Sequence, residues 1–134
     1  SSIEIVSFPK VKTVGYKAFL ECHQLSTVSM PEVEILNDYA FQKTPELVEF
    51  SSDTLTDIGN AAFSESGVQS VTLTSVTTMA LNVFSDCENL VSASSPQLTD
   101  LNIGTFENCT GLKNVDIPLL TKIGANAFIF AFWS

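Results

Sequence analysis

Arginine is absent from this sequence, and 6 lysines stand against 15 aspartates and glutamates, so the formal net charge at pH 7 is −9. A surface of this sign repels phosphate groups, which excludes nucleic acids and anionic membranes as expected partners. The single histidine and three cysteines are too few to favour a zinc site or a Ser-His-Asp triad. No apolar run reaches the roughly 18 residues of a membrane-spanning helix, so we expect no membrane insertion.

Apolar residues are plentiful by contrast, and they occupy 45% of the 134 positions. A chain of this length and composition is expected to form a folded domain rather than a disordered polymer. We therefore predict a single domain over residues 1–134. Because the chain begins Ser1-Ser2 rather than with methionine, we expect a cut or processed product. Because it opens within a repeat at Ile3 and without a cap, we also expect this domain to be a fragment of a longer repeat array.

Negative charge is concentrated in the middle of the chain. No lysine occurs between residues 44 and 112, whereas four lysines precede this stretch and two follow it. The pattern has two interpretations: a solvated acidic surface that confers solubility alone, or an acidic stripe that selects basic partners or cations. The nine acidic residues of the stretch are Glu46, Glu49, Asp53, Asp57, Glu65, Asp86, Glu88, Asp100 and Glu107.

Phenylalanine recurs with a period of 22 residues, shortened once to 21. An apolar residue precedes each of these phenylalanines by five positions and another by eight, as Ile58 and Leu55 precede Phe63. One such unit cannot bury its own apolar side, but stacked units bury it in continuous columns. The six repeats therefore predict a solenoid whose buried column consists of Phe19, Phe41, Phe63, Phe84, Phe106 and Phe128.

Each repeat also carries local structural signals. Residues 25–30 include an alternation of polarity typical of a short strand with one buried face, and Pro31 ends it because proline cannot donate to a strand ladder. The Ala-Phe-x-x-Cys spacing predicts a single helical turn. Gly67, in the shortened copy, is expected to allow a tightened turn through positive φ. We expect a left-handed corner at the glycine and asparagine column formed by Gly15, Asn37, Gly59, Asn102 and Gly124.

Four stretches represent the repeat consensus: Val28-Ser29-Met30-Pro31, Leu55-Thr56-Asp57-Ile58-Gly59, Asn60-Ala61-Ala62-Phe63 and Phe106-Glu107-Asn108-Cys109. With these stretches, residues 3–128 resemble the BspA-like, or TpLRR-type, leucine-rich repeats. The resemblance implies a β-rich α/β repeat fold, a right-handed solenoid of six repeats of about 22 residues with short parallel strands. It also implies a location at the cell surface or in the secreted fraction, often as an adhesin that binds host matrix proteins or other cells.

The cysteines do not indicate a catalytic or metal site. Cys22, Cys87 and Cys109 occupy one repeat column, and we expect them to be buried free thiols because stacked neighbours rarely have disulfide geometry. His23 directly follows Cys22, so the two side chains point in different directions and we expect an exposed imidazole.

Carboxylate pairs such as Asp86 and Glu88 lie in turns without a pocket signature, and no phosphate-binding loop or metal-ligand spacing occurs. We therefore expect no enzyme activity, no catalytic residue, no cofactor and no metal. The Asn108-Cys109-Thr110 motif matches a glycosylation acceptor, but its middle residue belongs to the buried column, so we do not expect it to be used.

Outward strand positions form two columns across the repeats. The first reads Ile5, Thr27, Glu49, Ser70, Ser92 and Asn114, and the second reads Ser7, Ser29, Ser51, Thr72, Ser94 and Asp116. Either small polar residues simply fill a crowded concave sheet, or they form a hydrogen-bonding platform for an extended protein or glycan. On the second interpretation, the candidate partner-binding residues are Glu49, Ser51, Ser70, Thr72, Ser92, Ser94, Asn114 and Asp116.

Two other surfaces leave alternatives open. Leu81 and Ile103 occupy neighbouring corner positions and either form an apolar patch or rotate inward. The apolar tail from Phe128 to Trp133 either caps the last repeat, packs against a second copy of the chain, or marks the cut end of a longer array. Self-association would use Phe130, Phe132 and Trp133.

These observations favour a binding function without catalysis. We expect a protein-interaction or adhesion module that binds a protein or glycan through its concave face. The alternatives are a structural spacer, which holds another domain away from its anchor, and an intracellular scaffold.

Overall fold

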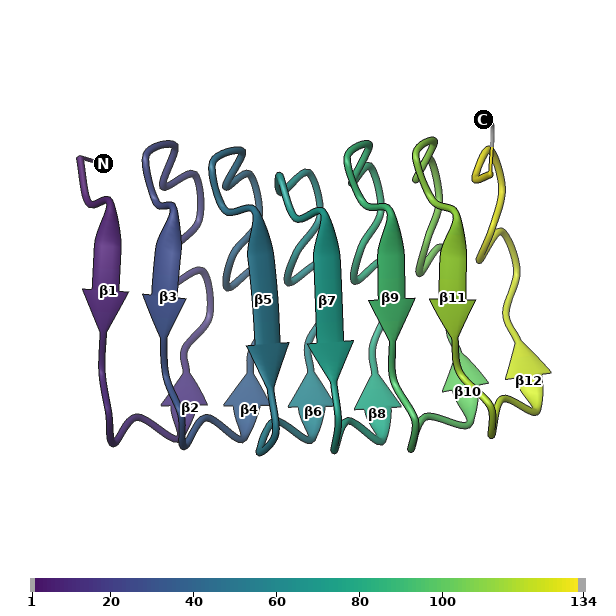
Figure 1. Cartoon of the computed structure of the whole chain (residues 1–134), viewed down its shortest axis with the longest axis horizontal. Helices are drawn as coiled ribbons and strands as arrows, with labels where there is room; N and C mark the ends of the chain where they lie inside the picture. The colour runs from purple at the N-terminus through teal and green to yellow at the C-terminus, as the bar shows by residue number, and fades with distance from the viewer. Residues whose placement is uncertain (1, 133–134) are drawn as a thin grey trace.

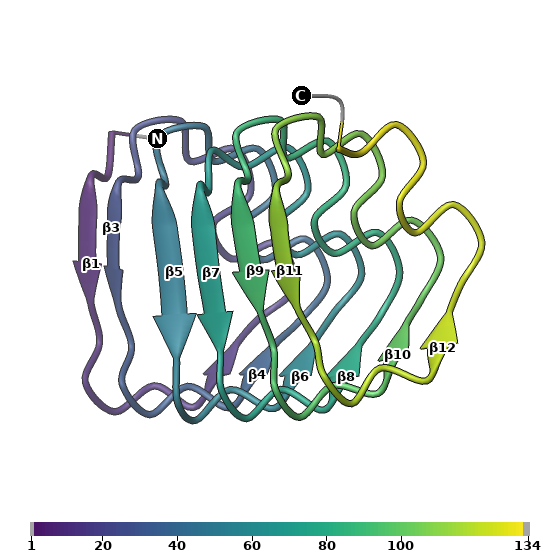
Figure 2. The same cartoon turned by 45° about the vertical axis from the view of Figure 1, so that its right-hand side comes forward.

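The computed structural model describes residues 2–132, which form a solenoid of parallel strands without a helix in that range. Each repeat contributes one longer strand and one two-residue strand, which lie on different sides of the solenoid (Figure 1, Figure 2). The longer strands are β1 (Ile5–Ser7), β3 (Thr27–Ser29), β5 (Glu49–Ser52), β7 (Ser70–Leu73), β9 (Ser92–Ser94) and β11 (Asn114–Asp116). The two-residue strands are β2 (Thr13–Val14), β4 (Ile35–Leu36), β6 (Asp57–Ile58), β8 (Thr78–Met79), β10 (Asp100–Leu101) and β12 (Lys122–Ile123).

Strand pairing follows the sequence period. The longer strands form a two-stranded sheet, β1-β3, and a four-stranded sheet, β5-β7-β9-β11. The two-residue strands form the sheets β2-β4-β6-β8 and β10-β12. Each pair is parallel and joins equivalent positions of successive repeats, as Phe50 with Val71. The predicted solenoid of short parallel strands is therefore confirmed.

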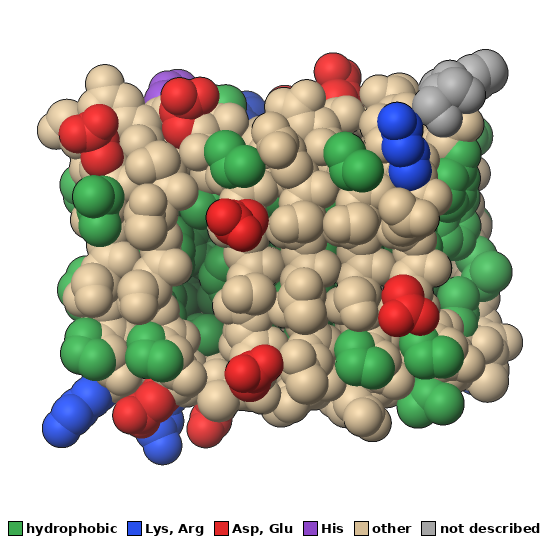
Figure 3. All heavy atoms as spheres, viewed as in Figure 1, with side chains coloured by type: hydrophobic (Ala, Val, Ile, Leu, Met, Phe, Trp, Pro, Cys, Tyr) green, Lys and Arg blue, Asp and Glu red, His purple; other side chains and the backbone are tan. Residues whose placement is uncertain are grey.

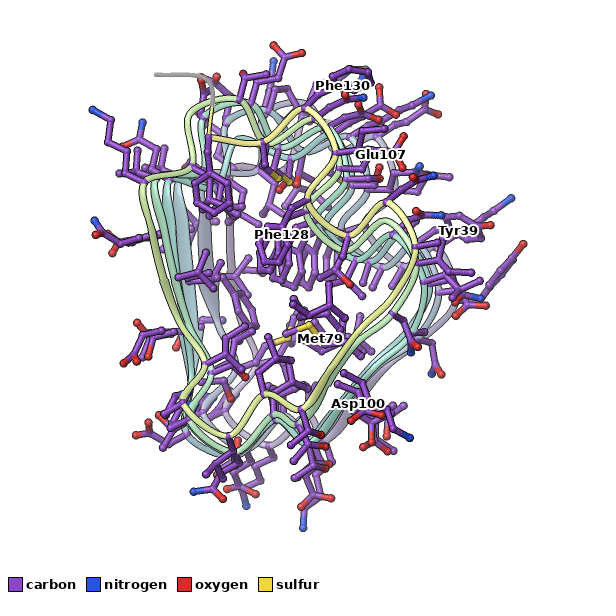
Figure 4. The ribbon with its side chains drawn as sticks, turned by 90° about the vertical axis from the view of Figure 1, so that its right-hand side faces the viewer. Tyr39, Met79, Asp100, Glu107, Phe128 and Phe130 are labelled. Atoms are coloured by element: carbon purple, nitrogen blue, oxygen red, sulfur yellow. The ribbon has the colours of Figure 1, made fainter. Side chains whose placement is uncertain are left out.

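The phenylalanine column forms the centre of the core. The rings of Phe41 and Phe63 are 5.5 Å apart between centroids and lie within 10° of parallel, and those of Phe63 and Phe84 are 5.4 Å apart at the same angle. Figure 4, which looks along the solenoid, shows this stack receding behind Phe128. Phe41, Phe63 and Phe84 are completely buried, so the column is the main apolar contact between successive repeats.

A single hydrogen-bonded turn follows the phenylalanines of the column; after Phe41 the bond comes from the hydroxyl of Thr44, at 2.7 Å. The amide of Cys87 donates to the carbonyl of Phe84 at 3.2 Å, and the amide of Cys109 donates to that of Phe106 at 3.1 Å. The prediction of a helical turn is wrong, however, because the third residue of the turn has positive φ, as at Asp86 (59°) and Asn108 (60°), whereas a right-handed helical turn needs negative φ. The turn does not lengthen into a helix, because the next residues return to the strand.

The expected left-handed corner was placed at the wrong column. Positive φ occurs two residues after it, for example at Lys17, Tyr39 and Asn82, and again four residues later in each repeat. At Gly59 and Gly124 of the glycine and asparagine column, the restriction is close packing against the preceding repeat. A Cβ on Gly59 would lie 2.6 Å from the backbone nitrogen of Asp38, whereas the side-chain amide of Asn102 donates to the carbonyl of Met79 at 2.6 Å.

The structure also contradicts positive φ as the reason for glycine at position 67. Among the described glycines, positive φ occurs only at Gly104. At Gly67, a Cβ would collide with the carbonyl oxygen of Pro45 and lie 2.7 Å from its carbon, and the Gly67 amide donates to the carbonyl of Thr44 at 3.0 Å. The shortened repeat therefore needs glycine because two backbones meet there, not because of an unusual backbone angle.

Candidate binding surface

The outward side chains of β1, β3, β5, β7, β9 and β11 form a surface that we call the strand face. Its residues alternate in exposure, as in β5, where Glu49 and Ser51 point outward and Phe50 and Ser52 are buried. All eight candidate partner-binding residues lie on the four-stranded sheet β5-β7-β9-β11, and the pairing places Thr72 between Ser51 and Ser94. The sequence prediction therefore describes one continuous surface, although partner binding itself stays a prediction.

The sequence period predicts that the two columns continue across all six repeats. In the structure they are interrupted between β3 and β5. Among the described residues, no strand pairing and no backbone hydrogen bond joins β3 to β5. Figure 1 shows β5 further from β3 than any other long strand is from its neighbour. Ser29 and Ser51 are consequently not register partners, and the strand face divides at this position.

The division is confined to the strand face. On the other sides the same two repeats stay joined, because β4 pairs with β6 and the amide of Phe41 donates to the carbonyl of Ala62 at 2.7 Å. The hydroxyl of Thr54 also donates to the carbonyl of Val33 at 2.6 Å. The two repeats are therefore in contact on the other sides of the solenoid and are separated at β3 and β5, where the gap faces solvent.

We attribute the opening to Phe50. The other repeats have valine or alanine at this inward strand position, as in Val28 and Val71, and only β5 has an aromatic ring there. The Phe50 ring is buried against two members of the phenylalanine column, 4.9 Å from Phe63 and 6.0 Å from Phe41 between centroids. A ring in a position sized for valine takes up extra width in a close-packed interior, and the neighbouring strand cannot approach to pairing distance.

A hollow of about 320 Å³ occupies the opening. Its base includes Val28, which is only partly buried although Val6, Phe50 and Val71 are buried at the same position of their strands. Figure 3 shows the depression with hydrophobic atoms inside it. The residues that line it are Val28, Ser29, Met30, Pro31, Ser51, Ser52 and Asp53.

Sequence reasoning missed this hollow. Of its lining residues, the candidate set contained Ser51 alone, because the prediction assumed that equivalent positions pair in every repeat. The signal was present in the inward column, where Phe50 is the only aromatic residue.

Carboxylates lie at both ends of β5. Glu49 is its exposed first residue, and Asp53 follows its last residue and is also exposed. The carboxylate of Asp53 accepts a hydrogen bond from the hydroxyl of Thr74 at 3.0 Å. No lysine occurs between residues 44 and 112, so these two carboxylates have no cation within their own repeat. The surface around β5 therefore attracts positive charge.

The corner opposite the strand face carries exposed apolar and aromatic side chains. Leu81 is 41% exposed and Ile103 is 49% exposed, so the inward rotation considered for them is wrong. Earlier in the chain, the rings of Tyr16 and Tyr39 meet edge to face at 5.9 Å, with the Lys17 ammonium 5.1 Å from the centre of the Tyr16 ring. These contacts join neighbouring residues of the first two repeats.

The cysteines are free and buried, as expected. The thiol of Cys87 contacts the carbonyl of Phe63 at 2.9 Å, and that of Cys109 contacts the carbonyl of Phe84 at 3.1 Å. Burial removes the thiolate from water and raises the pKa of Cys87 to about 11. Burial, with the neighbouring Cys87, also raises the pKa of Cys109. These thiols serve as small core residues rather than as nucleophiles.

We expect Cys87 to react with iodoacetamide at pH 8 at least about 100-fold more slowly in the native protein than in guanidinium chloride. The reason is that a pKa raised by about two units lowers the thiolate fraction about 100-fold, and burial also blocks access. Peptide mass spectrometry after timed quenching measures each cysteine separately. Rapid modification of native Cys87 would contradict the buried column.

The described part of the C-terminal tail extends the aromatic column. Phe128 stacks on Phe106 at 5.4 Å, and Phe132 stacks on Phe128 at the same distance. Phe130 remains 55% exposed and points away from the interior in Figure 4. The capping interpretation is therefore supported for Phe128 and Phe132. Self-association through Phe130 and Phe132 stays a prediction, and Trp133 lies outside the described residues.

Residues 2–132 contain no group of three or more His, Cys, Asp or Glu side chains arranged to hold a metal ion. None of the described residues belongs to a helix long and apolar enough to cross a membrane. His23 is exposed, as expected. The side-chain amide of Asn108 donates to the carboxylate of Asp86 at 2.7 Å, so this side chain already has a partner.

Comparisons with known proteins agree with this architecture. The family model of the BspA type leucine rich repeat region matches residues 12–131 in 6 copies. The chain is similar to a solved leucine rich repeat protein of T. pallidum, with 28% identity and a TM-score of 0.88, over 96% of this chain and 63% of that one. A leucine-rich repeat protein from Bacteroides ovatus shares the fold at 19% identity and a TM-score of 0.62, over 98% of this chain and 47% of that one. This chain therefore spans less than two thirds of either structure, and no curated protein matches it.

Proposed function

Because the chain belongs to the BspA-type leucine-rich repeat family, we propose that it is a non-catalytic adhesion module of a cell-surface or secreted protein. Its partner is a protein or glycan of another cell or of the surrounding matrix. The repeat family supports protein interaction in general. The surface location and the adhesive role are the further steps of the proposal.

The strand face is the observation that carries the proposal. Its four-stranded part presents hydroxyl and carboxylate groups in register, with Ser51, Thr72 and Ser94 side by side. Small hydroxyl side chains leave the surface open, and each can donate and accept a hydrogen bond. Solenoids commonly bind extended partners over such surfaces.

We expect the combined substitutions Ser51→Lys, Thr72→Lys and Ser94→Lys to weaken partner binding at least about tenfold, since long charged side chains displace the partner from the sheet. The measurement is binding of the purified protein to immobilised extracellular-matrix proteins and to a glycan array. Circular dichroism shows whether the variant is folded.

The matched control adds the same three charges outside the strand face, as Thr13→Lys, Thr78→Lys and Thr99→Lys. All three threonines are exposed, and the first two lie on β2 and β8. Equal loss in both variants would show that charge alone weakens binding, and binding that survives the strand-face variant would exclude this face. Absence of binding to any member of either panel would favour the structural spacer.

A further inference from the structure

We infer that the hollow between β3 and β5 binds an extended segment of a partner protein that carries the pattern basic-x-apolar-x-basic. The inference rests on the proposed function, and it names the subsite and the chemistry of the partner. The hollow receives the central apolar side chain. Glu49 and Asp53 bind the two cations, and the partner lies over the face of β5 with these three side chains pointing toward the protein.

The shape of the hollow favours a side chain rather than a whole strand. Its volume of about 320 Å³ lies at the lower limit of about 300 Å³ for ligand pockets. The two repeats remain joined behind it, since β4 pairs with β6. A full strand would need a second ladder spacing of about 4.8 Å between β3 and β5, and the β4-β6 pairing holds the repeats together on the other side.

The hollow has apolar side chains at its base, although most of its exposed lining is polar. Val28 is partly exposed there and Met30 and Pro31 also line it, although the inward residues of β5, β7 and β9 (Phe50, Val71 and Ala93) are buried. Covering apolar surface that water now contacts is favourable by about 25 cal/mol per Å². Methionine at such a site adapts to the shape of an entering side chain.

The backbone around the hollow favours an extended chain. Neither a strand pair nor a backbone hydrogen bond joins β3 to β5 within the described residues, so each strand has one edge without a strand partner. Because both edges face a gap too narrow for another strand, an extended partner lies over the strands rather than between them, and the side chains that alternate toward the protein decide which sequence fits.

Charge and spacing determine the sequence pattern of the partner. Glu49 and Asp53 are four residues apart along β5 and its continuation, which is about 13 Å in an extended chain. A partner lying along β5 places side chains of positions i and i+4 at the same separation. Basic residues there meet the two carboxylates, and the apolar residue between them lies level with Ser51, on the rim of the hollow.

The test is a selection from a display library of random linear peptides at low ionic strength, in which the protein is the bait and the bare support removes non-specific binders beforehand. Phenylalanine at position 28 fills the hollow, and Phe50 shows that the fold accepts a ring in this column. We expect the selected peptides to contain the basic-x-apolar-x-basic pattern. Their affinity, measured by calorimetry, should fall at least about tenfold in Val28→Phe and in Asp53→Lys.

The controls separate this inference from the proposed function. Asp57→Lys makes the same charge change on β6, away from the strand face, and should leave peptide affinity within about twofold. Peptides that bind Val28→Phe as well as the unmodified protein would overturn the inference, whatever the effect of Asp53→Lys. Peptides whose affinity falls with Thr72→Lys and Ser94→Lys but is unchanged by Val28→Phe would also overturn the inference. That outcome would retain the strand face as a binding surface.

Other occupants give distinct results. If the hollow binds a second copy of this chain, sedimentation shows a dimer that Val28→Phe abolishes, and no linear peptide is enriched. If it binds a glycan, the array signal depends on Val28 while peptides do not bind. Either result overturns the peptide as occupant.

Discussion

Replacing Phe63 with alanine is expected to lower the free energy of unfolding by about 3–5 kcal/mol, the range for removing a buried aromatic side chain. Phe63 is completely buried. Its ring contacts those of Phe41, Phe50 and Phe84, so its removal opens a cavity inside the column and breaks three ring contacts. Equilibrium denaturation in urea, followed by circular dichroism, measures the change.

The matched control for Phe63→Ala is Phe130→Ala. Phe130 is 55% exposed, and alanine there should change stability by no more than about 0.5 kcal/mol. A result for Phe63→Ala as small as the control would contradict a continuous aromatic column. Because each repeat contacts mainly its neighbours, the loss should also reduce the cooperativity of unfolding across the third repeat.

The second large effect is expected at Gly67, where alanine should cost about 1–3 kcal/mol through overpacking. The added Cβ would meet the Pro45 carbonyl group and lie 3.3 Å from the carbonyl oxygen of Leu47. Both are backbone atoms, which cannot rotate away as a flexible side chain can. Thermal and urea unfolding of Gly67→Ala measure the cost.

Gly15→Ala is the control for this substitution. Nothing lies within 4 Å of a Cβ at Gly15, and its φ is not positive. Alanine there should be neutral or stabilise by up to about 1 kcal/mol, because it restricts the unfolded chain. If Gly67→Ala is also neutral, the third repeat can move away from the second, and their close backbone contact is not required for stability.

Much of the fold follows from the repeat columns alone. The buried phenylalanines, the short strands and the free thiols were predictable, because each depends on a residue type recurring at a fixed interval. The glycine column shows the limit of such reasoning. Glycine is compatible with both positive φ and close backbone contact, and only the distance from Gly59 to the preceding repeat distinguishes the two causes.

The candidate site was predictable in part for the same reason. Alternation within a strand determines which side chains point outward, so Ser51, Thr72 and Ser94 were placed on one surface from the sequence. Whether neighbouring strands pair is a different question, because it depends on the volume that each inward side chain occupies. The sequence shows that Phe50 is the only aromatic residue of its column, but it does not show how far the ring separates the neighbouring strands.

The sequence by itself determined the number of repeats, the residues of the core and the acidic character of the middle of the chain. These features depend on residue type and interval, which a linear pattern contains completely. Only the tertiary structure decided that Phe50 separates β3 from β5 and that Val28 and Asp53 line a hollow there. The reason is that the spacing between strands depends on the volumes of side chains from repeats 22 residues apart. One ring in a valine position changes the distance between two backbones without changing the pattern of apolar and polar residues.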